Sequence, residues 1–160
     1  MYKFSVWVDA DSFPAKARSF LVSFASSKSV QVFFVANHEI KSSDPRVKMI
    51  VCQKEQNAAD NYIFEHALDN DIVVTRDIPF AARLVEKNIV VMNDRGLIFS
   101  KENIEDKLRE REFSLNLAGI GFGGNKGNFY GEKELGKFSR AFEQKIQEHI
   151  MNEIYNIKRR

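Results

Sequence analysis

Two aspartates stand one residue apart near the start of the chain, directly after an apolar run. The segment FSVWVDADS places Asp9 and Asp11 at the end of a stretch of apolar and β-prone residues, a pattern typical of a buried strand. Carboxylates in such a position can transfer protons or bind a hard cation. The chemistry of this chain therefore depends on which other side chains lie close to these two.

Other polar residues follow the later apolar runs in the same way. Asn37, Asp77 and Asn93 each stand within a few positions of the end of a predicted strand. Asp60 lies in the first turn of a helix predicted over residues 57–68. Because the carboxyl ends of parallel strands lie at one edge of a sheet, we expect these side chains to face one cleft.

The sheet is predicted from the alternation of short apolar runs with segments of helical spacing. Continuous apolar runs are typical of strands covered on both faces, as in parallel sheets. The sequence therefore predicts an α/β protein, with one three-layer α/β/α domain over residues 1–160 and a mainly parallel sheet of four or five strands. Strands are predicted at 4–9, 30–36, 47–52, 72–75 and 89–92, and helices at 12–26, 57–68, 78–87, 101–112 and 132–157.

The last third of the chain has a different composition. Residues 119–131 hold six of the eight glycines, which predicts a flexible loop, either a flap over the cleft or a plain connector. The segment 132–157 follows with an apolar stripe at helical spacing, which predicts an amphipathic helix.

A crowded set of carboxylates needs a counter-charge. Two unit charges about 4 Å apart repel by roughly 4 kcal/mol at an effective dielectric near 20. Some of the acids must take up protons, or a cation must lie among them. Oxygen ligands favour Mg²⁺ or Mn²⁺, which can polarise a phosphate and activate water. The hypothesis is metal-assisted phosphodiester hydrolysis by Asp9, Asp11, Asp60 and Asp77, with Asp9, Asp60 and Asp77 binding the metal.

A structural role is the alternative for each acid. Asp77 precedes Ile78-Pro79 and suits a helix N-cap, Asp11 can cap the first helix, and Asp60 can complement a helix N-terminus. Polar and basic residues near the predicted cleft are candidates for binding substrate, with a solvated surface as their alternative. These candidates are Asn37, Thr75, Arg76, Arg83 and Lys126.

Composition excludes little. A net charge of +2 and a pI near 8.6 neither require nor oppose a nucleic-acid partner. Cys52 is the single cysteine, so no disulfide can form within the chain, which suits a reducing compartment. There is no apolar run of transmembrane length and no cleavable leader, so we expect a cytoplasmic protein without a membrane partner. Nothing in the sequence indicates the oligomeric state.

Several motifs, taken together, resemble the YaiI/YqxD family. They are VDADSFP after the first strand, VAN after the second, NAADNYI at a helix start, and TRDIPFAARLVEKN followed by VMNDRG. The resemblance runs through about residues 1–113. It implies a PIN-like domain with an acidic metal site and nuclease chemistry on RNA or, less often, DNA. By position, Asp9, Asp60 and Asp77 match the acids of that site, and Asp11 is the second early acid.

Two other functions are consistent with the same residues. A haloacid-dehalogenase-like phosphatase also begins with a strand and Asp-x-Asp, and there Asp9 would be the nucleophile. That class requires Ser or Thr after its second strand, where this chain has Asn37. The other alternative is a non-catalytic module that binds RNA or a nucleotide.

Overall fold

The described residues form one continuous sheet that is surrounded by helices. The computed structural model describes residues 2–11, 13–40, 44, 47–122 and 129–155. Within these residues, six strands form one sheet in the order β3-β2-β1-β4-β5-β6. The first five pair in parallel, and β6 pairs antiparallel with β5. The strands are β1 (Ser5–Asp9), β2 (Gln31–Ala36), β3 (Val47–Val51), β4 (Ile72–Val74), β5 (Val90–Met92) and β6 (Ile98–Phe99).

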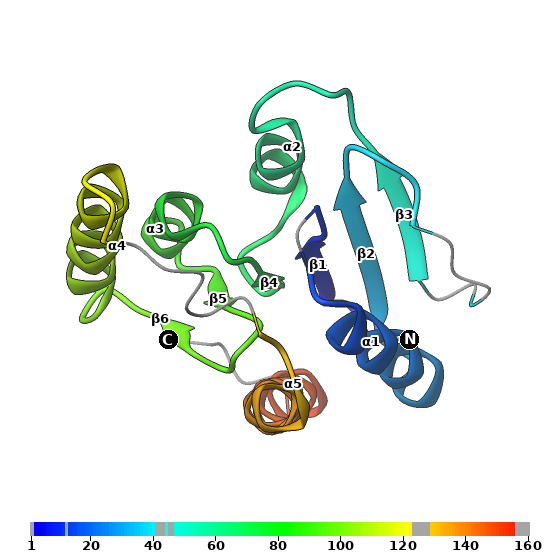
Figure 1. Ribbon diagram of the computed structural model, residues 1–160. Coiled ribbons are helices and arrows are strands. Elements are labelled where there is room, and N and C mark those ends of the chain that lie inside the picture. The colour runs from blue at the N-terminus through cyan, green and yellow to red at the C-terminus, as the bar shows by residue number, and fades with distance from the viewer. Residues whose placement is uncertain (1, 12, 41–43, 45–46, 123–128, 156–160) are drawn as a thin grey trace.

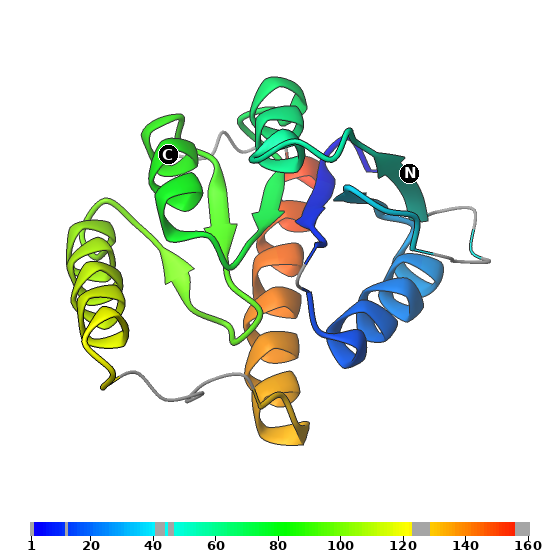
Figure 2. The same ribbon diagram turned by 45° about the horizontal axis from the view of Figure 1, so that its top comes forward.

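Helices cover both faces of this sheet (Figure 1). The helices α1 and α5 pack on one face, and α2, α3 and α4 pack on the other. Figure 2 shows α5 running the length of the molecule behind the strands. The helices are α1 (Ala15–Lys28), α2 (Ala58–His66), α3 (Ile78–Glu86), α4 (Ile104–Gly119) and α5 (Glu132–Ile154). The predicted three-layer α/β/α class with a mainly parallel sheet is confirmed.

The alternation of side chains along each strand fills both layers. In β1, Val6 and Val8 lie in the cluster with α1 and α5, whereas Trp7 lies in the cluster with α2 and α3. Phe138 and Phe142 of α5 are fully buried in the first cluster. Burial of such a side chain stabilises the fold by about 1.5–3 kcal/mol, so the long terminal helix is an integral part of the core.

The predicted strand count was too low by one, because β6 was missed. A strand of two residues is too short to show an alternating pattern in the sequence. It forms because a tight turn returns the chain from β5. The Asn93 side chain accepts hydrogen bonds from the backbone N–H groups of Arg95 and Leu97, both at 2.9 Å. Gly96 lies in this turn with φ +83°, where an added Cβ would lie 2.5 Å from the Lys137 carbonyl oxygen.

The largest differences from the predicted helix boundaries lie in α1 and α4. The first helix begins at Ala15 rather than Ser12, because Pro14 is extended at the N-cap position (φ −62°, ψ 140°). No side chain caps this helix, so the predicted cap by Asp11 is wrong, and Ser12 lies outside the described residues. The helix α4 continues to Gly119 instead of ending near 112, since the Leu and Ala residues there favour helix.

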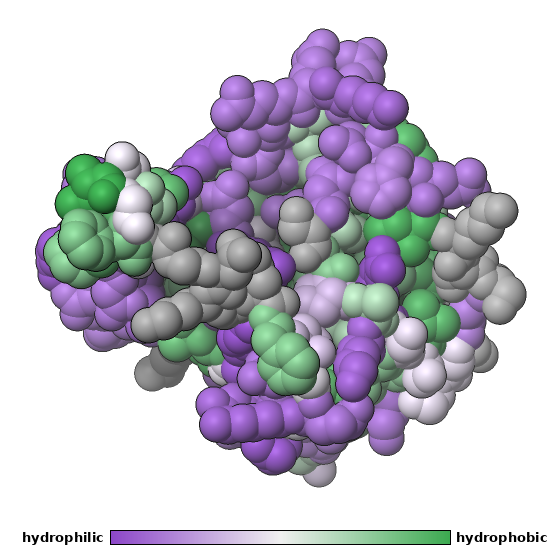
Figure 3. Space-filling model, in the orientation of Figure 1, coloured by the Kyte–Doolittle hydropathy of each residue, from purple (hydrophilic) through white to green (hydrophobic). Residues whose placement is uncertain are grey.

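Only the first half of α4 packs against the body of the protein. Ile104 is buried and Leu108 is partly buried in the cluster with α3. Beyond them, Phe113, Leu115 and Ile120 are exposed. Figure 3 shows the corresponding hydrophobic surface at the edge of the molecule where α4 lies. Residues 123–128 of the predicted glycine-rich loop, and 156–157 of the predicted last helix, lie outside the described residues.

Candidate active site

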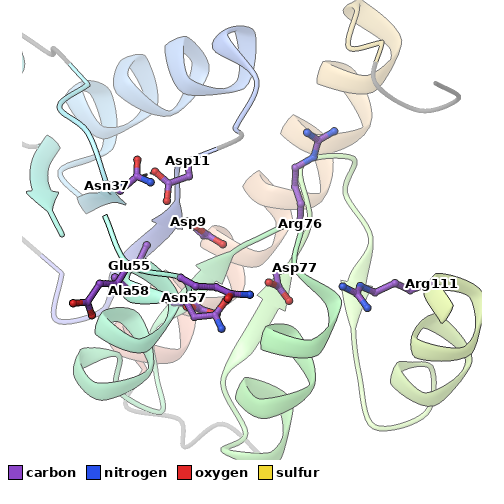
Figure 4. Close-up of a pocket in the computed structure, with 12 residues that line it drawn as sticks. Asp9, Asp11, Asn37, Glu55, Asn57, Ala58, Arg76, Asp77 and Arg111 are labelled. Atoms are coloured by element: carbon purple, nitrogen blue, oxygen red, sulfur yellow. Dashed lines mark hydrogen bonds between the residues drawn. The ribbon is translucent and has the colours of Figure 1, made fainter. Parts of the chain in front are cut away.

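A pocket of about 460 Å³ opens beyond the carboxyl ends of β1 and β4. The chain order reverses between these two neighbouring strands, and ligands bind at such switch points in open α/β sheets. Figure 4 shows the side chains around the opening. They are Asp9, Asp11, Asn37, Glu55, Gln56, Asn57, Ala58, Ala59, Asp60, Arg76, Asp77 and Arg111.

Asp9 lies at the floor of this pocket, as the last residue of β1. The Thr75 hydroxyl, which follows β4, donates a hydrogen bond of 2.9 Å to Asp9 Oδ2. The same Thr75 oxygen accepts a hydrogen bond of 3.1 Å from the backbone N–H of Asp77. Thr75 is fully buried, so it holds two of the predicted site acids in fixed relation from beneath the pocket.

The surroundings of Asp9 oppose its ionisation. The pKa of Asp9 is raised from 3.8 to about 6 as the net result of several causes. Burial is the largest of them, the Thr75 hydrogen bond lowers the pKa, and the negative charges of three acids add to the increase; these acids are Asp60, Asp11 and Asp77. All three of these acids therefore lie close enough to Asp9 to influence it. A group with this pKa is protonated in part of the molecules near neutral pH.

Asp60 enters the pocket from the first turn of α2. Its side chain is 8% exposed, and Oδ1 accepts a hydrogen bond from the Asn61 backbone N–H at 3.0 Å. Burial raises the pKa of Asp60, and the charge of Asp77 raises it too. Asn57, the N-cap residue of this helix, has a left-handed backbone (φ 64°) and makes no side-chain capping hydrogen bond. Asp60 and Asn57 both line the pocket.

Asp77 and Asp11 each combine a backbone contact with a place in the pocket. Asp77 Oδ1 accepts a hydrogen bond from the Phe80 N–H at 2.9 Å, so it caps α3 as the structural alternative predicted. Asp11 Oδ1 accepts the Asn37 N–H at 2.7 Å, which ties the segment after β2 to the segment after β1. A structural role and a functional role are therefore compatible for both acids.

The donor set suits a hard cation in kind but is not assembled around one. Four aspartates and one glutamate, Glu55, present only oxygen ligands to the pocket. Within the described part of the chain, however, no group of three or more His, Cys, Asp or Glu side chains is gathered closely enough to hold a metal ion. Burial is the largest cause of the raised pKa of Asp9, and repulsion by the other acids adds to it; a bound cation would offset this repulsion.

The basic candidates have different surroundings. Arg76 lines the pocket, and its Nε lies 2.9 Å from Oδ2 of the buried Asp94. Arg83 is not among the lining residues: its guanidinium lies over the Phe64 ring, 4.2 Å from the centroid. Lys126 falls outside the described residues. Thr75 lies below the pocket surface, as described above.

The sequence reasoning missed several lining residues. Glu55 and Gln56 immediately precede the predicted helix at 57–68, so their place beside Asp60 followed from the same argument. Arg111 lies in a highly charged helix, where composition alone does not distinguish one arginine from another. Its spacing from Ile104 and Leu108 was the usable signal, because residues seven and three positions apart share one face of a helix.

Comparison with known proteins places this chain in one family. The family model described as "Uncharacterized BCR, YaiI/YqxD family" matches residues 7–148. A UPF0178 protein of Treponema denticola is 39% identical over 138 residues, covering 86% of this chain and 88% of the relative. A UPF0178 protein of Psychromonas ingrahamii is 35% identical over 146 residues, covering 89% and 95%. The chain belongs to the YaiI/YqxD family, as the sequence motifs predicted.

Two further findings complete the description. No solved structure matches this protein. None of the helices in the described residues has the length and apolar character needed to cross a membrane.

Proposed function

We propose that the protein is a metal-dependent hydrolase of phosphodiester bonds, with RNA as the expected nucleic acid. The observation that carries the proposal is the meeting of Asp9, Asp11, Asp60 and Asp77 in one pocket. These acids come from widely separated parts of the chain, and Asp60, Asp11 and Asp77 all raise the pKa of Asp9. Such an arrangement costs stability, which favours a role in binding a cation.

Asp9, Asp60 and Asp77 are the residues that would hold Mg²⁺ or Mn²⁺, with Asp11 beside them. When bound, the ion would polarise a phosphate and lower the pKa of a water molecule. The chain itself contributes orientation: the buried Thr75 hydroxyl fixes one oxygen of Asp9, and the helix cap fixes Asp77. Because the described acids are not close enough to hold an ion as they stand, binding of the metal requires their side chains to move closer to one another.

Titration calorimetry with Mn²⁺ tests the site directly. We expect wild-type protein to bind Mn²⁺, and Asp9→Asn and Asp60→Asn each to weaken binding at least about tenfold, as removal of a charged ligand does. Glu65→Gln is the matched control, since Glu65 is an exposed acid of α2 that does not line the pocket. Equal Mn²⁺ affinity in Asp9→Asn and Glu65→Gln contradicts the proposed metal site.

Cleavage of a fluorescently labelled RNA tests the reaction. Activity should require Mn²⁺ or Mg²⁺, stop on addition of a chelator, and be lost in Asp77→Asn purified in the same way. The asparagine side chain of this variant can still accept a hydrogen bond from the Phe80 N–H, so α3 keeps a cap and the loss is not one of folding. Cleavage that survives in this variant indicates a contaminating nuclease.

A non-catalytic nucleic-acid-binding module is the second candidate. The observation in its favour is that no metal-ligand group is preassembled among the described residues. RNA binding without Mn²⁺-dependent cleavage, unchanged in Asp77→Asn, would support it. The phosphatase alternative is weaker, because that class requires Ser or Thr after its second strand, where this chain has Asn37.

A further inference from the structure

Two arginines line the acidic pocket, and their surroundings differ. Arg76 forms an ion pair with Asp94, whose side chain is almost completely buried. Arg111 is exposed, and no hydrogen bond or ion pair joins it to any other residue that the structure describes. The guanidinium of Arg76 is therefore committed within the fold, whereas the guanidinium of Arg111 can bind a ligand.

The packing of α4 determines where Arg111 points. Ile104 and Leu108 pack into the cluster that α3 shares, and Arg111 lies on the same face of the helix one turn later. Figure 4 shows its side chain extending from α4 toward Asp77. No ion pair forms between Arg111 and any of the described pocket acids, although they line one opening. Its charge thus adds a cationic edge to a pocket whose floor is acidic.

An arginine in this position suits the recognition of a phosphate. The planar guanidinium can donate two parallel hydrogen bonds to phosphate oxygens and keeps its charge at all physiological pH values. Five acidic side chains line the same pocket and repel the phosphates of a nucleic-acid backbone. A cationic side chain nearby would offset this repulsion. A nucleic-acid strand that contacts Arg111 would reach the carboxylates from the side of the pocket where α4 lies.

We propose that Arg111 is a substrate-binding residue that binds a backbone phosphate of a nucleic-acid strand lying across the pocket. Arg76 has a structural role instead, through its ion pair with Asp94. The inference rests on the proposed function and adds the direction from which the strand enters. It commits to a phosphate contact, so its effect should be independent of base sequence.

Fluorescence anisotropy with a fluorescein-labelled oligouridylate tests this contact, using the full chain with a chelator present so that no cleavage occurs. We expect Arg111→Gln to weaken binding about five- to tenfold and to reduce the slope of log affinity against log salt by about 1. Arg111→Lys should retain part of the affinity, because the charge remains but the paired donors are lost.

Arg109→Gln is the matched control. Arg109 lies two residues away on α4, pairs with Asp106 and Glu105, and does not line the pocket. Its replacement should change the affinity less than about twofold, with the salt slope unchanged. Equal effects of Arg109→Gln and Arg111→Gln overturn the inference, and so does a wild-type protein that does not bind the oligonucleotide.

The outcome is separable from that of the proposed function. If Mn²⁺ binds to wild type but the two arginine variants behave alike, the metal site is supported and the phosphate contact of Arg111 is contradicted. If Mn²⁺ does not bind but Arg111→Gln alone weakens oligonucleotide binding, the phosphate contact is supported and the protein is a binding module.

Discussion

Two aspartates near opposite ends of the same strands have contrasting environments. Asp71 lies where β1 and β4 begin, and it is 3% exposed. It accepts hydrogen bonds from the Ser5 N–H at 2.8 Å, the Trp7 Nε1–H at 2.9 Å and the Leu68 N–H at 2.9 Å. Asp9 lies where β1 ends, and one hydrogen bond reaches it from a described residue, Thr75. Burial and three nearby carboxylates raise the pKa of Asp9.

The contrast separates a structural acid from a candidate functional one. Three donors bond to the two oxygens of Asp71, so this side chain joins the strands and the turn before β4. Burial and the neighbouring carboxylates oppose the charge of Asp9, so its ionised form weakens the fold. A pKa raised from 3.8 to about 6 corresponds to roughly 3 kcal/mol of lost stability at pH values above both. The sheet therefore has a well hydrogen-bonded acid where β1 and β4 begin, and an acid whose charge is opposed where β1 ends.

Replacing Asp71 should have the largest effect on stability. Asp71→Ala leaves three donors without their acceptor, two from the backbone and one from the Trp7 indole, in a buried site. We expect the free energy of unfolding to fall by about 3–5 kcal/mol. Urea denaturation followed by Trp7 fluorescence measures this. A loss below about 1 kcal/mol would mean that the turn before β4 rearranges and that Asp71 does not join the strands.

Replacing Asp9 should have the opposite sign. Asp9→Asn removes a charge that burial and three acids oppose, so we expect this variant to be more stable than wild type by about 1–3 kcal/mol at about pH 7.5. The sign follows from linkage: the folded protein binds the Asp9 proton more tightly than the unfolded chain. Wild-type stability should therefore decrease as pH rises from about 4 to 6 and remain reduced above it. The variant should lack this dependence, and urea titrations at several pH values provide the measurement.

Parts of this contrast could be predicted from the sequence and parts could not. The strand end at Asp9 and the helix start at Asp77 are marked by continuous apolar runs and by Pro79. The pairing of β1 with β4 rather than with a later strand is not marked, because parallel pairing leaves no local pattern. No sequence pattern marks the role of Asp71, since two of its three donors, Ser5 and Trp7, are 66 and 64 residues away along the chain.

The sequence also predicted the candidate acids without showing how they are held. Their positions after strands and at a helix start implied convergence. The bridge through Thr75 depends on side-chain geometry that a sequence pattern does not contain. Arg111 depends on the rotation of α4, which Ile104 and Leu108 fix by packing. The acids that line the pocket were thus more predictable than the contacts that position them.

Replacing Thr75 should sharpen the contrast at smaller magnitude. Thr75→Val removes the hydrogen bond that lowers the pKa of Asp9 and leaves the Asp77 N–H without its acceptor. We expect a loss of about 1–2 kcal/mol in stability and an Asp9 pKa above its wild-type value. Thr75→Ser keeps the hydroxyl and should retain the wild-type pKa. Carbon-13 NMR of aspartate carboxyl groups across pH measures the shift; an unchanged Asp9 pKa in Thr75→Val would show that the hydroxyl does not act on this acid.

The smallest effect we expect is the release of protons when Mn²⁺ binds. Since Asp9 has a pKa of about 6, a cation that requires its ionised form must displace the proton that part of the molecules carry. About half a proton should leave per ion at about pH 6, and close to none at about pH 8. Calorimetry in two buffers of different ionisation enthalpy gives this number directly. Equal proton release at both pH values would show that the cation does not bind to Asp9. The contrast between Asp9 and Asp71 would then give no support to a metal site where β1 ends.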